Sequence, residues 1–161
     1  MPLIDNTGQQ TADAWTSLPD DAPATSGPII VSLTRLLAES PALPAPLGVL
    51  IPPDAKLETL ALHLPHLALV AIAFPKFRDG RGFTLARTLR EQYHFTGELR
   101  ATGHPLPDQF VALLRCGITT VDVPATQKIE TWRELLTQRG VPAETPLPFI
   151  RRSALPYGAR G

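Results

Sequence analysis

Short apolar segments alternate with segments of helical periodicity four times between residues 47 and 140, and no other feature of the sequence restricts the fold as much. In the helical segments, apolar residues recur at spacings of three and four. Strands and helices that alternate in this way form a mostly parallel sheet with right-handed crossovers. The sequence therefore predicts an α/β fold, with a small parallel sheet of about four βα units. The predicted strands comprise residues 47–51, 67–74, 97–103 and 118–123.

The segment 67–74, LALVAIAF, is apolar throughout, as expected for a parallel strand that is covered on both faces. We expect this strand and the helices around it to share one hydrophobic core. The residues predicted to be buried in that core are Leu69, Ile72, Phe74, Leu89, Leu113 and Trp132.

Four βα units fit two architectures, a doubly wound sheet or half of a (βα)8 barrel. A half barrel would leave edge strands exposed. It would call for a partner chain, such as a second copy in a homodimer, or for cover by the N-terminal segment. That segment contains a candidate strand at 29–31 and a short helix opened by Ser32, and Trp15 is a candidate docking residue.

Proline is concentrated toward the two ends of the chain. Of the 18 prolines, nine precede residue 54, four follow residue 140 and five lie between. Because proline removes a backbone donor and interrupts regular structure, both ends are predicted to be irregular. We expect an N-terminal extension at 1–46 that packs on an α/β domain at 47–140, followed by a flexible tail at 141–161.

Composition excludes several classes of function. The chain has 15 basic and 15 acidic residues, which argues against a nucleic-acid partner. No segment approaches the twenty apolar residues of a membrane span, so we expect no membrane association. The N-terminus lacks the pattern of a signal peptide, and a single cysteine suits a reducing compartment. These features predict a cytoplasmic protein.

The loop at 74–83 follows the most apolar predicted strand and leads into a predicted helix. Its two glycines permit close approach of the backbone to a ligand, and its basic side chains add positive charge to the free N–H groups of the helix start. This combination predicts an oxyanion site, and the alternative is an ordinary Asp-Gly turn. The candidate residues for binding an anion or a partner are Lys76, Arg78, Asp79, Gly80, Arg81 and Gly82.

Two further candidates come from the neighbouring segments. Arg100 lies near the end of the third predicted strand, where its side chain could meet the loop around Arg81. Two converging arginines would hold sulfite, sulfate or a cofactor phosphate, and the alternative is a salt bridge from Arg100 to Asp79 or Asp108. Asp108 opens the next predicted helix, where it either caps the free N–H groups or contacts the ligand.

The sequence identifies no catalytic residue, metal site or cofactor. Cys116, the single thiol, lies in the last turn of a predicted helix, where the dipole disfavours the thiolate, so we expect a small buried residue. The four histidines lack the spacing of metal ligands. No glycine motif for a dinucleotide or a nucleotide triphosphate is present.

Three blocks of the sequence are distinctive as whole motifs, namely FPKFRDGRGFTLARTLRE, GELRATG and DQFVALLRCG. In this order and at this spacing they resemble an uncharacterised bacterial family, the domain of unknown function 934. The resemblance extends from the opening MPLID through Trp15 and GPIIVSLTRLLAE to about Val123. The chain departs from the family at His104, where members often carry an acid, and in its tail, which lacks an aromatic strand-like ending.

The resemblance implies a role but no mechanism. Genes of family members usually lie beside those of assimilatory sulfite reductase, and some members carry an oxidoreductase label, so the resemblance implies a role in sulfate assimilation. The family has no established catalytic residue or cofactor to carry over. We expect an accessory protein of assimilatory sulfite reduction that docks to sulfite reductase or its electron donor. The alternative is an oxidoreductase or other enzyme that binds an oxyanion or a phosphorylated cofactor at the 74–83 loop.

Overall fold

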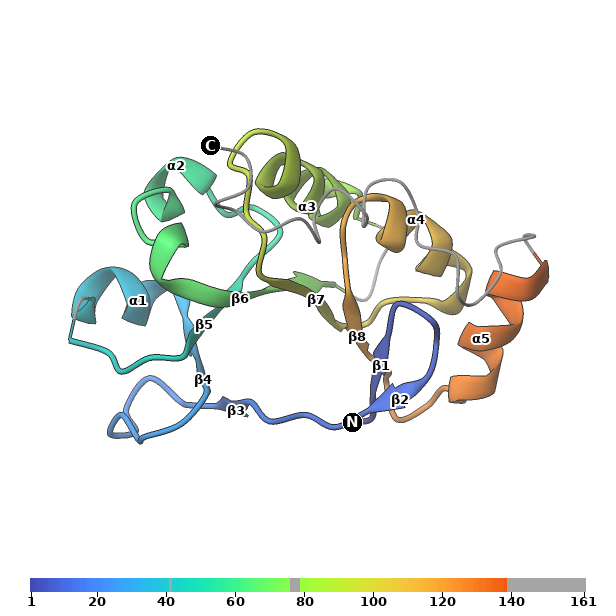
Figure 1. The fold of residues 1–161 in the computed structure, drawn as a ribbon, viewed down its shortest axis with the longest axis horizontal. Helices are drawn as coiled ribbons and strands as arrows, with labels where there is room; N and C mark the ends of the chain where they lie inside the picture. The colour runs from blue at the N-terminus through green and yellow to red at the C-terminus, as the bar shows by residue number, and fades with distance from the viewer. Residues whose placement is uncertain (41, 76–78, 139–161) are drawn as a thin grey trace.

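The structure, a computed structural model, describes residues 1–40, 42–75 and 79–138, which form one curled sheet with helices on its outer face (Figure 1). The strand order is β2-β1-β8-β7-β6-β5-β4-β3. The strands are β1 (Leu3–Asp5), β2 (Gln10–Thr11), β3 (Thr16–Ser17), β4 (Ile29–Ser32), β5 (Leu47–Ile51), β6 (Leu67–Phe74), β7 (Glu98–Gly103) and β8 (Thr120–Asp122).

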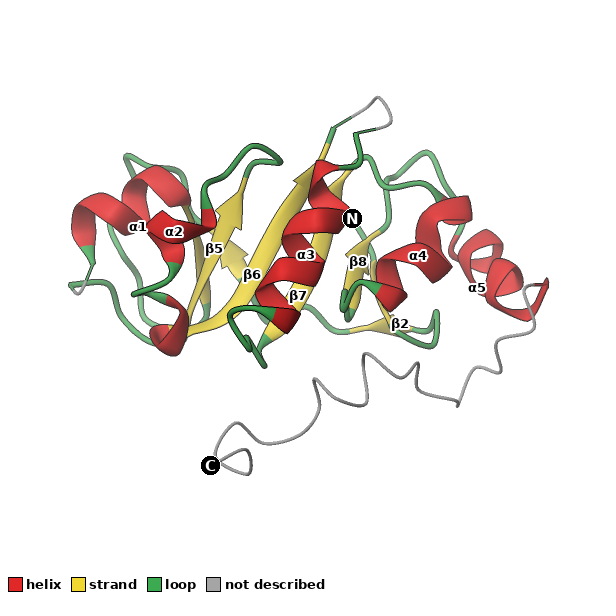
Figure 2. Ribbon diagram, turned by 90° about the horizontal axis from the view of Figure 1, so that it is seen from above, coloured by secondary structure: helices red, strands yellow, loops and turns green. Residues whose placement is uncertain are grey.

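Strands β4 to β8 are parallel and lie side by side in the order of the chain. The α-helices of the described residues all cover the same face of the sheet (Figure 2). A doubly wound sheet would reverse its strand order and carry helices on both faces, whereas a (βα)8 barrel keeps sequential order with helices outside. The predicted α/β fold is confirmed, and of its two architectures the molecule adopts the half barrel.

The helices begin and end largely where local sequence signals favour it. Ser32 opens the first helix, because its side-chain oxygen accepts a hydrogen bond from the Arg35 backbone N–H at 3.1 Å. Gly117, with a φ of 102°, follows the fourth helix in the left-handed conformation. The helices are α1 (Leu33–Glu39), α2 (Leu57–Leu60), α3 (Arg81–Glu91), α4 (Phe110–Arg115) and α5 (Ile129–Gln138), with short 3-10 turns at Leu64–His66 and Pro107–Gln109.

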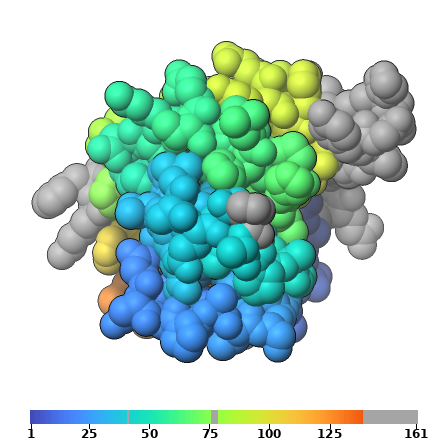
Figure 3. All heavy atoms as spheres, turned by 90° about the vertical axis from the view of Figure 1, so that its left-hand side faces the viewer, coloured from blue at the N-terminus to red at the C-terminus, as the bar shows by residue number. Residues whose placement is uncertain are grey.

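The N-terminal segment belongs to the same sheet as the residues that follow it. Strand β4 pairs in parallel with β5, and β1 pairs antiparallel with β8, so the segment extends both sides of the parallel sheet. Residues 12–15, here called the strap, connect β2 to β3 across the inner face (Figure 1). In Figure 3, which shows the end of the molecule near α1 and β4, the blue and cyan N-terminal residues pack directly against the green residues that follow.

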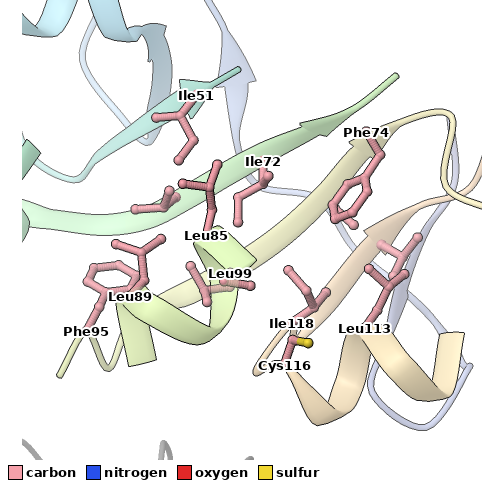
Figure 4. Packing of buried hydrophobic residues seen from close by; sticks show 14 of the residues in the cluster. Ile51, Ile72, Phe74, Leu85, Leu89, Phe95, Leu99, Leu113, Cys116 and Ile118 are labelled. Carbon is pink, nitrogen blue, oxygen red and sulfur yellow. The ribbon is translucent and has the colours of Figure 1, made fainter. Parts of the chain in front are cut away.

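The main hydrophobic core lies between the outer face of the sheet and the helices (Figure 4). Five of the six residues predicted to share one core belong to it, namely Ile72, Phe74, Leu89, Leu113 and Trp132. The assignment of Leu69 to that core is wrong, because side chains alternate along a strand and Leu69 points to the opposite face from Ile72. On that inner face, Leu69 packs with Ile30, Ala71 and Trp15.

Among the described residues, no helix combines the length and the apolar character that crossing a bilayer requires. The predicted tail at 141–161 lies outside the described residues.

Candidate functional site

The carboxyl ends of the parallel strands form one rim of the half barrel, and in βα folds this rim is the usual location of binding sites. The loop at 74–83 leaves β6 at this rim and enters α3. Of its candidate residues, Lys76 and Arg78 lie outside the described residues. Asp79, Gly80 and Arg81 lie directly at the start of α3.

Asp79 and Arg81 form an ion pair at the start of α3. The Asp79 carboxylate accepts a hydrogen bond from the Arg81 backbone N–H at 3.0 Å and from Arg81 Nε at 2.9 Å, and Arg81 Nη2 also donates to it. The Arg81 side-chain and backbone hydrogen bonds lower the pKa of Asp79 to about 2. A helix start attracts anions, and here the chain's own carboxylate lies at that position.

The two glycines of the loop, and Gly103 at the end of β7, differ in what surrounds them. A Cβ on Gly82 would lie 2.7 Å from Cε1 of Phe74, so Gly82 lets the first turn of α3 pack directly on the end of β6. Gly103, with a φ of 93°, would place a Cβ 2.6 Å from the Phe74 carbonyl oxygen. A Cβ on Gly80 would meet nothing within 4 Å. Close packing on a common neighbour, Phe74, therefore accounts for glycine at both positions 82 and 103.

Arg100 lies on the inner face of the sheet, away from the loop. It is the third residue of β7, paired in register with Ala71 on β6, and it is only 3% exposed. Its Nη1 donates to Asp13 Oδ2 at 3.0 Å and its Nη2 donates to Asp13 Oδ1 at 3.2 Å. Its Nε and Nη2 also donate to Glu98 Oε2, at 3.0 and 2.9 Å. Arg100 thus holds the strap, through Asp13, against the sheet.

Two further polar side chains complete this inner-face cluster. Thr120 donates its hydroxyl hydrogen to Glu98 at 2.7 Å, and Asp122 lies 4.0 Å from Arg100 Nη1. Burial raises the pKa of Asp122, although the hydrogen bond from Thr102 and the charge of Arg100 act in the opposite direction. The cluster contains more carboxylates than cations, so it does not resemble a site for an anion.

The structure does not bring Arg81 and Arg100 together, because each has its own carboxylate partner on a different side of the sheet. Asp108 is exposed in the 3-10 turn before α4. The side chain that accepts a backbone hydrogen bond there is that of Gln109, whose Oε1 accepts from the Leu106 N–H at 2.9 Å.

Sequence reasoning could have found part of the inner-face cluster. Glu98 and Arg100 are two residues apart on a strand and must share a face, and Thr120 and Asp122 share a face for the same reason. Asp13 carried no such signal, since it lies 87 residues before Arg100 in an irregular segment.

Cys116 is buried, as the sequence predicts. Its Sγ lies 3.7 Å from Nη2 of Arg87. Because Arg87 lies on α3, far from Cys116 along the chain, nothing in the sequence indicated this contact. The described residues contain no group of three or more His, Cys, Asp or Glu side chains that could hold a metal ion. Within the same residues, every buried side-chain nitrogen and oxygen has a hydrogen-bond partner.

Comparisons with known proteins identify the family of the chain. A search of curated proteins found no match, and neither did a search of solved structures. The model of a family described as bacterial protein of unknown function (DUF934) matches residues 48–142, a region that includes the 74–83 loop and strands β6 to β8. Because this match covers more than half of the chain, the protein belongs to the DUF934 family.

Proposed function

We propose that this protein is a cytoplasmic accessory protein of assimilatory sulfite reduction, which docks to sulfite reductase or to its electron donor. The role in sulfite reduction is what the resemblance to the family implies. The docking surface is the rim at the start of α3, where Asp79 and Arg81 form a charged group at the protein surface.

The observation that supports docking over catalysis is the internal pairing of the candidate charges. Arg100 is paired with Asp13 and Glu98, and the Asp79 carboxylate occupies the helix start that an external oxyanion would need. The Arg81 side chain is nevertheless 59% exposed. Exposed charges held in fixed positions contribute mainly to the association rate and the specificity of protein complexes.

The proposal is tested by binding of the purified protein to purified sulfite reductase, and separately to its electron donor, from the same organism. We expect saturable binding that weakens as the salt concentration rises, because rim charges are screened. Arg81→Glu should weaken binding by about tenfold, which corresponds to about 1.4 kcal/mol. Arg115→Glu is the matched control, since Arg115 is an exposed arginine in the last turn of α4, at the other end of the sheet. Failure of the unchanged protein to bind either partner would contradict the proposal.

A second candidate is an enzyme that holds an oxyanion at the loop, and the exposure of Arg81 at the start of the 11-residue helix α3 favours it. The decisive measurement is the melting temperature with sulfite, sulfate or phosphate against chloride at equal ionic strength. Sulfate stabilises proteins generally, so the unchanged protein must be compared with Arg81→Ala. Docking predicts the same anion response in the unchanged protein and Arg81→Ala. A response that Arg81→Ala loses would favour the enzyme, as would a flavin or haem spectrum of the purified protein.

A further inference from the structure

A cavity of about 420 Å³ opens at the amino ends of β6 and β7, at the other end of the sheet from the rim. One side is lined by Leu64 and Pro65 of the 3-10 turn and by Leu67, the first residue of β6. The other side is lined by residues 93–97, which connect α3 to β7. The volume lies within the range of small-molecule sites.

A buried arginine fixes the shape of the 93–97 side. Arg90 is 5% exposed, and its Nη1 donates to the carbonyl oxygens of Phe95 at 2.7 Å and of Gly97 at 2.8 Å. Its Nη2 donates to the carbonyl oxygen of Gly117 at 2.8 Å. Burial lowers the pKa of Arg90 to about 10, which reflects the cost of removing the guanidinium from water. The hydrogen bonds offset this cost and hold an irregular connection in one conformation.

The backbone of the same connection is strained and closely packed. His94 has a φ of 55°, which is uncommon for a residue other than glycine. A Cβ on Gly97 would lie 2.5 Å from Cζ of Phe95 and 2.6 Å from the carbonyl oxygen of Ala68. Strained backbone that the surrounding structure enforces is concentrated at binding sites. The cavity is therefore preformed, and a ligand would not have to order this wall.

The lining selects for one kind of ligand. Among the described lining residues, Tyr93 and His94 carry rings that are not fully buried, whereas the ring of Phe95 is buried in the main core, with the Arg90 guanidinium 5.8 Å from its centroid. No Asp, Glu, Lys or Arg is present among these lining residues. The hydroxyl groups of Tyr93 and Thr96 supply two hydrogen-bonding groups. Aromatic rings stack favourably with other rings, whereas a charged ligand would find no side chain of opposite full charge.

We propose that this cavity binds a small, uncharged aromatic molecule with a hydrogen-bonding edge. The site is separate from the docking rim, so either proposal can be contradicted without affecting the other. The probe is indole, a neutral bicyclic aromatic with one N–H donor, and the comparison compound is cyclohexanol, which is apolar with one hydroxyl but has no ring face.

The experiment is a titration of the isotope-labelled full chain followed by NMR. We expect indole to produce saturable shifts of the backbone amide signals of residues 93–97, and cyclohexanol at the same concentrations to produce none that saturate. Ala61→Phe places a ring at the lining and should abolish the saturable shifts. Ala112→Phe, the same change at an exposed position on α4, should leave them unchanged.

Three results would overturn the proposal. The first is the absence of saturable shifts in the unchanged protein, and the second is equal binding of cyclohexanol. The third is indole binding that persists in Ala61→Phe. If Ala61→Phe lowers the melting temperature, Thr96→Phe on the opposite side of the cavity provides the same block, and binding that survives it also contradicts the proposal.

Discussion

At the scale of single residues, two glycines of the rim loop differ in what surrounds them. Gly82 lies against the ring of Phe74, whereas Gly80 faces open space and has a φ of −74°, which other residues adopt readily. Gly82 lies inside α3, whereas Gly80 is its N-cap residue.

We predict that Gly82→Ala lowers the free energy of unfolding by about 1–3 kcal/mol, because the new Cβ would overlap Phe74 and displace α3 from β6. Gly80→Ala is the matched control and should cost less, about 1 kcal/mol or below, because its Cβ meets nothing and only the N-cap preference for glycine is lost. Chemical denaturation of both variants measures the difference. Equal stabilities would contradict the close packing of α3 on Phe74.

The Asp79–Arg81 pair predicts a pH dependence. The pKa of Asp79 falls from an ordinary value of 3.8 to about 2 on folding. Because the folded-state pKa is depressed, the stabilisation is fully present above about pH 4 and is lost as the pH falls toward 2. The difference in melting temperature between the unchanged protein and Asp79→Asn should shrink over this interval, and should also shrink at high salt. A constant difference across the interval would show that Asp79 does not stabilise the fold through its charge.

At the scale of elements, the strap is attached to the inner face by two side chains of different character. Asp13 reaches Arg100 through two hydrogen bonds, and Trp15 packs on the cluster of Ile30, Leu69 and Ala71. Gly48 belongs to the same face, where a Cβ would lie 3.1 Å from Leu69 and 3.2 Å from Ile30. The strap therefore covers the inner face through one polar contact, Asp13 with Arg100, and one apolar contact, Trp15 with the cluster.

We predict unequal costs for the two members of the Asp13–Arg100 pair. Asp13→Ala should cost about 1 kcal/mol or less, because the Asp13 side chain is 35% exposed and Arg100 keeps Glu98. Arg100→Met should lower the free energy of unfolding by about 3–5 kcal/mol, because the carboxylates of Glu98 and Asp122 would lose the cation that balances their negative charge. Hydrogen exchange of residues 10–17 should accelerate in Asp13→Ala and in Trp15→Ala. Unchanged exchange in both variants would show that these contacts do not hold the strap.

At the scale of the whole molecule, the main core draws on both the N-terminal segment and the family-matched region. Ile4, Ile29, Val31 and Leu36 are each no more than 1% exposed and belong to the main core. They lie before residue 48, where the match to the family begins. Strands β1 and β4 also cover the backbone hydrogen-bonding edges of β8 and β5.

We therefore predict that residues 47–161 do not fold without residues 1–46. The shortened chain would expose two sheet edges and lose the four core side chains, so it should show no cooperative thermal transition by circular dichroism. Adding residues 1–46 as a separate peptide should restore part of the transition. A cooperative transition in the shortened chain alone would establish residues 47–161 as an independent folding unit.

Local chemistry in the sequence was sufficient to predict strands β4 to β8, but not the short strands β1 to β3. Strands β5 and β6 coincide with the predicted segments, and Ser32 begins α1, because apolar runs and capping hydroxyl groups act over a few residues. The loop at 74–83 was also identifiable as distinctive, although Asp79 pairs with Arg81 and not, as one of the alternatives had it, with Arg100.

The tertiary structure alone decided which distant groups meet. The sequence contained nothing to pair Arg100 with Asp13, to place Leu69 on the inner face, or to set Gly82 and Gly103 on Phe74. It also gave no sign that Arg90 holds the cavity wall through three carbonyl groups. Such contacts depend on the curvature of the sheet and on which face each strand presents, and these arise only when all of the strands pack together.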